Sequence, residues 1–394
     1  MIHFIGGNQI KLLRNGTEYF PALEAAIESA VHEIYLQTYM YKADAAGICI
    51  GNALKQAAQR GVTVNVLLDG FGCKDLSKAY IQELELAGVQ VMFYRPKISP
   101  WTLKKRRLRR LHRKVAVIDS KIGFVGGINI IDDCSVDHLH HNAPPRIDYA
   151  VRIEGRLLPV MVASVHKLWR RIAWAHLQQV DMSAAKATPH IPQHNIEGSV
   201  KEGMKAKFVL RDNVLHRRDI EEAYLAAIGH AKSEIIIANA YFVPGRRFRK
   251  ALLAAAKRGV VVKLLLQGRM EYFLMFATHA FYNEFLRNGI EIYEYRKSFM
   301  HSKVAVIDSQ WATIGSSNID PFSLFLAREA NVLVQDTTFA TELRTDIIST
   351  IQEGAHRVSA QEWARGNLVK RIASWLAYGL VRVFLGVIGY SNER

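Results

Sequence analysis

The chain has 394 residues, 49% of them apolar, so it is long enough for two cores of ordinary domain size and too apolar to be disordered. Lysine and arginine outnumber aspartate and glutamate by 52 to 36, and the net charge of +16 favours anionic partners: nucleic acids, phosphorylated molecules or anionic lipid surfaces. The cysteines Cys49, Cys73 and Cys134 are widely spaced and form no CxxC pair, which argues against a disulfide framework and a thiolate zinc site.

The N-terminus "MIHFIGGNQIKLL" lacks the basic, apolar and small-residue parts of a secretory signal. The sequence therefore predicts a protein of the reducing cytoplasm.

The predicted elements repeat between the two halves of the chain. "ALKQAAQRGVTVNVLLDG" (53–70) returns as "ALLAAAKRGVVVKLLLQG" (251–268), and each copy is an apolar helix, an Arg-Gly stop and a β-branched strand. The flanking pairs are helices 21–33 and 219–234, strands 34–41 and 235–243, and strands 89–95 and 290–296. This alternation predicts an α/β fold made of two similar α/β/α sandwich domains related by a pseudo-twofold.

A polar stretch broken by prolines, residues 181–203, separates the two halves. We expect an N-terminal domain at 1–185, a linker at 186–204, a C-terminal domain at 205–360 and a membrane-associating segment at 361–394.

One block with chemistry-bearing side chains occurs twice. "HRKVAVIDSKIGFVGGINI" (112–130) and "HSKVAVIDSQWATIGSSNI" (301–319) agree at 11 of 19 positions and share the pattern H-x-K-x4-D-x6-G-x2-N. The shared pairs are His112/His301, Lys114/Lys303, Asp119/Asp308, Gly126/Gly315 and Asn129/Asn318. Alternate residues of a strand share a face, so each histidine should project beside its lysine. A pseudo-twofold would bring both sets into one pocket at the domain interface.

Such a pocket suits a phosphodiester. Two lysines and the asparagine and backbone donors can neutralise the phosphate oxygens without a metal ion. One histidine can attack phosphorus and form a phosphohistidine, while the other acts as general acid and then base. A catalytic histidine needs a carboxylate to fix its tautomer, and each motif is followed at a distance by a candidate, Asp148 or Glu329. Asp119 and Asp308, at the strand ends, should anchor turns rather than touch substrate.

The doubled "HRKVAVID…GGIN" and "HSKVAVID…GSSN" resemble the paired HKD motifs of the phospholipase D superfamily, over nearly the whole chain. "LLDGFG" (67–72), "DYAVRIEG" (148–155), "IIIANAYFVPG" (235–245) and "WATIGSSNIDPFSL" (311–324) are similar to bacterial cardiolipin synthases of the short type. The resemblance implies phosphatidyl transfer from phosphatidylglycerol or phosphatidylethanolamine to phosphatidylglycerol, with no cofactor, at the cytoplasmic face of the bacterial cell membrane.

Carried over to matching positions, the resemblance implies a catalytic set of His112, Lys114, Asp119, His301, Lys303 and Asp308. His112 would be the nucleophile and His301 the acid and base. The supporting positions are Asn129, Asn318, Gly126, Gly127, Gly315, Ser316, Asp148 and Glu329. Gly127 departs from the pattern, because many superfamily members have serine there, as the second copy does at Ser316. Hydroxyl help to the phosphate would then come from one side only.

Basic residues crowd the stretch before the first motif. No acid occurs between Glu85 and Asp119, but ten basic residues do: Arg95, Lys97, Lys104, Lys105, Arg106, Arg107, Arg109, Arg110, Arg113 and Lys114. A basic residue close to an anionic bilayer contributes about 1 kcal/mol, so we expect residues 104–110 to contact lipid headgroups. A solvated loop is the alternative interpretation.

The C-terminal stretch 368–389 is apolar, with only Lys370, Arg371 and Arg382 charged. A bilayer crossing would leave Arg382 near the membrane centre at a cost of about 3 kcal/mol, so a helix lying in the interface with Trp375 costs less. Docking as an ordinary core helix is the alternative.

Three other interpretations are less well supported by the sequence. The clump "DDCSVDHLHH" (132–141) could be drawn as a metal site from Asp132, Asp137, His138, His140 and His141, but its spacing matches no familiar zinc or calcium loop. A nuclease of the same superfamily would use the same motifs and charge, yet it would not need the apolar C-terminus, so we do not expect nucleic acid as the partner. A non-catalytic lipid-binding protein could lose a motif histidine, whereas both are intact here.

Overall fold

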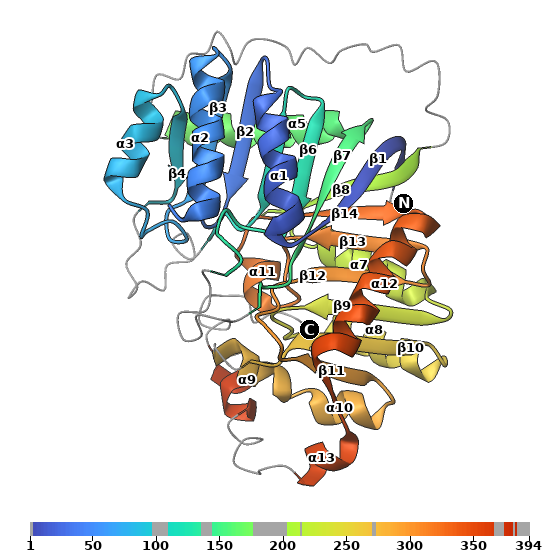
Figure 1. Ribbon diagram of the computed structural model, residues 1–394. Helices are drawn as coiled ribbons and strands as arrows, with labels where there is room; N and C mark the ends of the chain where they lie inside the picture. The colour runs from blue at the N-terminus through green and yellow to red at the C-terminus, as the bar shows by residue number, and fades with distance from the viewer. Residues whose placement is uncertain are drawn as a thin grey trace.

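The computed structural model describes residues 3–96, 109–134, 144–175, 203–212, 215–269, 273–365, 374–380 and 383. These residues form one sheet of 15 strands, in the order β15-β11-β10-β9-β12-β13-β14-β8-β1-β7-β6-β5-β2-β3-β4 (Figure 1). The N-terminal half contributes β1 Ile5–Arg14, β2 Glu33–Thr38, β3 Thr63–Asp69, β4 Gln90–Tyr94, β5 Lys114–Ile118, β6 Ile122–Gly126 and β7 Tyr149–Gly155. The C-terminal half contributes β8 Met204–Arg211, β9 Glu234–Asn239, β10 Val261–Gln267, β11 Glu291–Tyr295, β12 Lys303–Ile307, β13 Trp311–Gly315, β14 Glu329–Gln335 and β15 Ala355–Val358.

The strand order of one half repeats in the other, which confirms the predicted duplication. Strands β2, β3 and β4 are parallel, as are β9, β10 and β11, and the remaining pairs are antiparallel. The two half-sheets join at their edges, where β1 pairs antiparallel with β8. The mixed sheet therefore runs without interruption through both halves.

Helices cover both faces of each half-sheet (Figure 1). In the N-terminal half they are α1 Asn15–Glu28, α2 Ala45–Gln59, α3 Lys78–Leu86 and α5 Leu158–Ala175. In the C-terminal half they are α7 Asp219–His230, α8 Arg246–Lys257, α9 Phe273–His279, α10 Tyr282–Arg287, α11 Pro321–Phe325, α12 Thr337–Gly354 and α13 Ala360–Arg365. The expected α/β/α layers are thus present in both halves. The predicted linker falls almost wholly outside the described residues.

Three apolar clusters hold these layers together. One packs α1, α2 and α3 on the N-terminal half-sheet, and a second packs α7, α8 and α10 on the C-terminal half-sheet. The third contains side chains of α5 and α12 together with strands of both halves. Because this third core is shared, burial of apolar surface favours the two halves staying together. Arg14 and Tyr149 of the N-terminal half add contacts to Asp346 of α12, at 2.8 Å and 2.5 Å.

The two strands of each repeated block are joined by the same tight turn. Asp119 and Ser120 have φ of 50° and 55°, and Asp308 and Ser309 have φ of 52° and 51°. Two consecutive positive φ values are typical of the type I′ turn, whose twist matches that of a hairpin. Asp119 accepts hydrogen bonds from the backbone N–H groups of residues 31–33 at 2.7–2.9 Å, and Asp308 does the same for residues 232–234. Both carboxylates therefore tie a hairpin to the start of the neighbouring strand.

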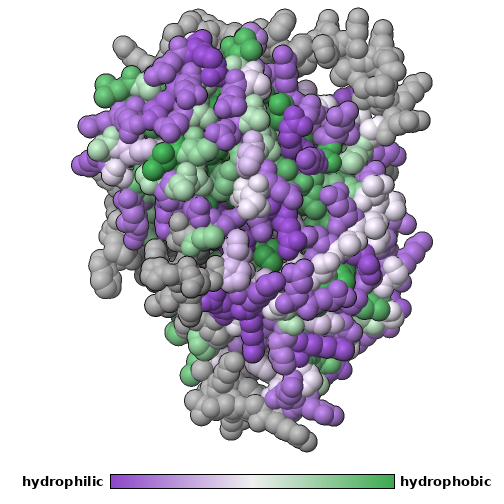
Figure 2. Space-filling view, in the orientation of Figure 1, coloured by the Kyte–Doolittle hydropathy of each residue, from purple (hydrophilic) through white to green (hydrophobic). Residues whose placement is uncertain are grey.

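The face drawn in Figure 2 is mostly hydrophilic, and its hydrophobic surface is divided into small patches. Within the described part of the chain, no helix combines the length and the apolar character needed to cross a bilayer.

The turn aspartates generate a stability prediction. Asp119→Ala should lower the free energy of unfolding by about 3 kcal/mol, because three backbone donors lose a charged acceptor and alanine is strained at positive φ. Asp119→Asn, which tolerates the turn and keeps one acceptor oxygen, should cost about 1 kcal/mol. Urea unfolding measures both. Substitution of the exposed Asp75 by alanine is the control and should change the free energy of unfolding by less than about 0.5 kcal/mol. A loss in Asp119→Ala no larger than that of the control would contradict the anchoring role.

Candidate active site at the junction of the two halves

Two backbone bridges set the two motifs against each other. The N–H of His112 donates to the carbonyl of Arg328 at 3.0 Å, and the N–H of His301 donates to the carbonyl of Ile147 at 2.8 Å. Both bridges run parallel and connect segments from opposite halves of the chain. The residues that follow Arg328 and Ile147 are acidic, so each histidine meets a carboxylate of the other half.

Each imidazole is held by that carboxylate. His112 Nδ1 lies 2.9 Å and 3.1 Å from the two oxygens of Glu329, and His301 Nδ1 lies 2.7 Å from Asp148 Oδ2. Both carboxylates are fully buried. In the part of the chain that the structure describes, neither Nε2 atom has a hydrogen-bond partner, so the carboxylates fix Nδ1 as the bonded nitrogen and leave Nε2 for chemistry. Sequence analysis identified both carboxylates but not this crossed pairing.

The two motif lysines lie inside the same arrangement. Lys114 Nζ donates to the carbonyl of His112 at 2.8 Å, and Lys303 Nζ donates to the carbonyl of His301. Both lysines are buried, and burial lowers the pKa of Lys114 to about 8 and that of Lys303 to about 7. Each lysine interacts electrostatically with Asp148 and Glu329 alike. The two His–Lys pairs therefore share one electrostatic environment.

Burial determines the protonation state of the site's histidines. Burial lowers the pKa of both histidines, and for His301 burial together with the nearby Lys303 lowers it to about 3. Burial acts to raise the pKa of Asp148, but Lys303 and His301 outweigh it and hold the pKa below its usual range. Below about pH 7 both lysines carry a charge, and their two positive charges balance those of the two carboxylates. A bound phosphodiester monoanion would add one negative charge, which protonation of one imidazole would balance.

The difference between Gly127 and Ser316 acts on the carboxylates. Ser316 Oγ donates to Glu329 Oε2 at 2.5 Å, so the hydroxyl supports the partner of His112. At Gly127 an added Cβ would lie 2.2 Å from Asp148 Oδ1. A side chain at position 127 therefore does not fit beside Asp148, the residue that corresponds to Glu329. The Ser316 contact orients Glu329, while direct help from the hydroxyl to a phosphate stays a prediction.

The other supporting positions are two closely packed glycines, Gly126 and Gly315, and two asparagines, Asn129 and Asn318. Added Cβ atoms would come within 2.5 Å of backbone at Gly126 and 2.2 Å of the Asn331 side chain at Gly315, so both positions require glycine for close packing. The N–H of Met40 donates to Asn129 Oδ1 at 3.1 Å, whereas the buried Asn318 Oδ1 has no hydrogen-bond partner among the described residues.

Sequence analysis missed one residue that positions the first motif. Asp69, at the end of β3, is buried and accepts from the N–H of Leu111 at 2.7 Å, directly before His112. A signal was present in the repeat of 53–70 and 251–268, because Asp69 and Gln267 are polar residues at the same position, where an apolar strand ends. Gln267 is also buried, but neither of its side-chain polar atoms has a hydrogen-bond partner among the described residues.

The basic segment is only partly described. Lys104, Lys105, Arg106 and Arg107 lie outside the described residues, as does Arg382. Arg110 turns inward, with Nη1 3.7 Å from Asp69 Oδ1. Arg113 is buried and donates to Gln37 and Ser164 at 2.7 Å and 2.8 Å, so it belongs to the core and not to an exposed basic surface.

The clump at 132–141 is described only in part as well. Asp132 accepts from the N–H of Cys134 at 2.8 Å, while Asp137, His138, His140 and His141 lie outside the described residues. Within the described ranges no three histidine, cysteine or acidic side chains are grouped as metal ligands.

The charge balance predicts a change in histidine protonation on ligand binding. In the empty protein, ring ¹⁵N NMR should show His301 neutral from about pH 5 to pH 8, because its pKa is about 3. Addition of dimethyl phosphate should protonate one motif imidazole, and the spectra of His301→Asn and His112→Asn would identify which. Two imidazoles that stay neutral with the phosphodiester bound would contradict the balance.

Comparison with known proteins places this site in a family. The sequence profile described as "Cardiolipin synthase, PLD-like domain" matches residues 23–141 and 224–350. Cardiolipin synthase B of Salmonella typhimurium is 38% identical over 98% of this chain and 90% of its own length. The same protein of Escherichia coli strain K12 is 38% identical over the same shares. A probable cardiolipin synthase of Bacillus subtilis is 30% identical over 97% of this chain and 72% of its own length.

Among solved structures, phosphatidylserine synthase of Haemophilus influenzae superposes with a TM-score of 0.70 at 15% identity and covers 98% of this chain and 96% of its own. At that identity the likeness shows the fold, with the same duplicated α/β architecture. The chain therefore belongs to the cardiolipin synthase family of the phospholipase D superfamily.

Proposed function

We propose that this protein is a phosphatidyltransferase that makes cardiolipin from phosphatidylglycerol through a phosphohistidine intermediate, without a metal ion. One observation carries the mechanism: two crossed imidazole–carboxylate pairs and two buried lysines form a single cluster at the junction of the halves. Such a cluster supplies a nucleophile, an acid and fixed positive charge for a phosphodiester. The similarity to named cardiolipin synthases supports the lipid substrate.

In the first step, His112 Nε2 attacks the phosphorus of the donor lipid and the bond to the headgroup oxygen breaks. Protonated His301 gives its Nε2 proton to that oxygen, so the headgroup alcohol leaves as glycerol from phosphatidylglycerol, or as ethanolamine from phosphatidylethanolamine. Lys114 and Lys303 stabilise the charge that builds on the phosphate oxygens. Glu329 stabilises the positive charge on the phosphorylated His112 ring, because its carboxylate contacts Nδ1.

In the second step, a glycerol hydroxyl of phosphatidylglycerol gives its proton to His301 and attacks phosphorus. The P–N bond to His112 breaks, cardiolipin forms, and both histidines return to their starting states. Covalent trapping lets the first alcohol leave before the second enters. Asp119 and Asp308 act at a distance in this scheme, since their carboxylates hold backbone N–H groups at the hairpin turns.

A membrane-associated location fits this chemistry. We propose that the protein works as a peripheral protein at the cytoplasmic face of the cell membrane, with basic and apolar side chains near the headgroups. Trp375 supports this, because it is 58% exposed on the helical stretch 374–380. Anionic phospholipids would then be both substrate and surface.

The reaction is tested by incubating purified protein, in chelator, with phosphatidylglycerol vesicles and separately with plasmid DNA. We expect cardiolipin by mass spectrometry and intact DNA. His112→Asn and His301→Asn should each lower the transfer rate about 1000-fold, because each removes the nucleophile or the acid. His356→Asn, a half-exposed histidine in β15, is the control and should keep full activity. DNA nicking with unchanged lipids would overturn the proposal in favour of a nuclease.

The same experiment assigns the nucleophile. His301→Asn incubated with short-chain phosphatidylglycerol and quenched in detergent at mildly alkaline pH, where the P–N bond survives, should carry a phosphatidyl adduct on the peptide that contains His112. An adduct found instead on His301 in the matching His112→Asn sample would reverse the two roles.

A further inference from the structure

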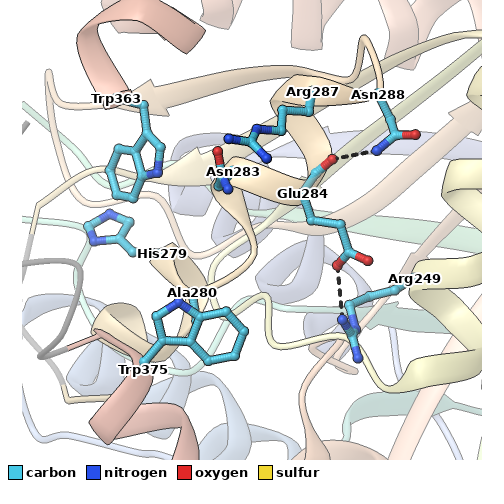
Figure 3. Close-up of a pocket in the computed structure, with 9 residues that line it drawn as sticks. All are labelled: Arg249, His279, Ala280, Asn283, Glu284, Arg287, Asn288, Trp363 and Trp375. Carbon is cyan, nitrogen blue, oxygen red and sulfur yellow. Dashed lines mark hydrogen bonds and ion pairs between the residues drawn. The ribbon is translucent and has the colours of Figure 1, made fainter. Parts of the chain in front are cut away.

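A cavity of about 430 Å³ lies in the C-terminal half and contains no residue of the catalytic cluster. Its walls come from α8, the consecutive helices α9 and α10, α13 and the helical stretch 374–380 (Figure 3). The catalytic scheme gives this cavity no task. Its lining nevertheless combines cationic, amide and indole groups.

The polar part of the lining suits an anion. Arg287 and Asn283 project from α10 toward the cavity, and neither has an ion pair or side-chain hydrogen bond among the described residues (Figure 3). Arg249 donates to Glu284 at 2.9 Å, while its buried Nε atom has no partner there. The cavity thus contains two guanidinium groups against one carboxylate. Guanidinium groups match phosphate oxygens in charge and in geometry.

A buried polar atom also lacks a partner at this cavity. His279 is 5% exposed, its Nε2 lies 3.2 Å from Glu294 Oε1, and its Nδ1 has no hydrogen-bond partner among the described residues. Burial raises the pKa of Glu294, but the hydrogen bonds and charges of His279 and Arg296 outweigh it and lower that pKa to about 2. A buried ring nitrogen without a partner costs free energy. Because Nε2 faces the Glu294 carboxylate, the Nδ1 of a neutral ring is an acceptor, and a hydroxyl of a glycerol headgroup would satisfy it by donating a hydrogen bond.

Apolar side chains beside the cavity are exposed on the surface of the protein. Trp363 and Trp375 form the side of the cavity opposite Arg287 (Figure 3). The stretch 374–380 docks on the protein through buried Ala377 and through Tyr378, whose ring lies 4.8 Å from that of Phe281. Its other large side chains and the next described residue are exposed by 58–64%: Trp375, Leu376, Leu380 and Val383. An apolar surface therefore lies beside the cationic cavity.

We propose that this cavity is a second, non-catalytic lipid site, which binds the phosphate headgroup of an anionic phospholipid while the exposed apolar side chains enter the bilayer. Charge complementarity supports an anionic headgroup, because Arg287 lines the cavity and has no ion-pair partner among the described residues. Tryptophan beside arginine suits the membrane interface, where an amphipathic ring contacts both headgroups and acyl chains. The inference rests on the proposed function only in placing the enzyme at a lipid surface.

The test compares Arg287→Gln with Arg171→Gln, an exposed arginine on α5 outside the cavity. Full-length proteins are sedimented with vesicles of phosphatidylglycerol and phosphatidylcholine, and with phosphatidylcholine alone. Arg287→Gln should weaken binding to the anionic vesicles about fivefold, and Arg171→Gln less than twofold. Turnover of monomeric short-chain phosphatidylglycerol should stay within twofold of wild type in both variants, which shows that the active site is intact.

A second measurement identifies the ligand. Short-chain phosphatidylglycerol should change tryptophan fluorescence in wild type, and Trp375→Phe should remove most of that change. Glycerol phosphate at the same concentration should have little effect; an equal effect would mean a soluble phosphate ligand and would overturn the lipid assignment.

The outcomes separate this inference from the proposed function. Anionic-vesicle binding by Arg287→Gln equal to that of Arg171→Gln, with cardiolipin still formed by wild type, would overturn the second site alone. If Arg287→Gln bound anionic vesicles more weakly than Arg171→Gln while the wild type made no cardiolipin, the second site would be supported and the proposed function contradicted.

Discussion

The crossed hydrogen bonds between each histidine and a carboxylate of the opposite half are the constraint on which the rest of the structure depends. His112 is oriented by Glu329 and His301 by Asp148, so neither half contains a complete site. Three features hold the two halves in the position that these hydrogen bonds require. They are the sheet that joins the halves at their edges, the core shared by α5 and α12, and the parallel bridges at Arg328 and Ile147. Duplication alone supplies two copies of a motif; only the joined sheet brings them together in one cluster.

Burial gives this arrangement its chemistry and also its cost. Two lysines and two carboxylates are removed from water, and they are tolerated because their charges sum to zero and each group has a partner. The lowered pKa values of Lys303 and His301 record the desolvation. In the proposed reaction, a bound phosphodiester anion would favour protonation of an imidazole, so substrate binding would be coupled to the charging of the general acid. The same desolvation would strengthen each electrostatic contact with a bound phosphate.

Much of this could be predicted from the sequence, because local patterns determine local structure. The repeat fixed the order of helices and strands, and the spacing of two placed each histidine beside its lysine. The crossed pairing could not be predicted, since the choice of Glu329 for His112 depends on a bridge between segments over 200 residues apart. The burial of Arg113 against Gln37 could not be predicted either, because the sequence alone does not separate a buried arginine from its neighbours in a basic run. The cationic cavity is likewise formed by segments that only the folded chain brings together.

A double-mutant cycle on the free energy of unfolding tests the crossed geometry most directly. His112→Gln combined with Glu329→Gln, and His301→Gln combined with Asp148→Asn, should each show a coupling of about 1 kcal/mol or more, because each pair shares a buried hydrogen bond. The same-half combinations, His112 with Asp148 and His301 with Glu329, should show clearly smaller coupling. Coupling as large or larger within the halves than between them would contradict the account.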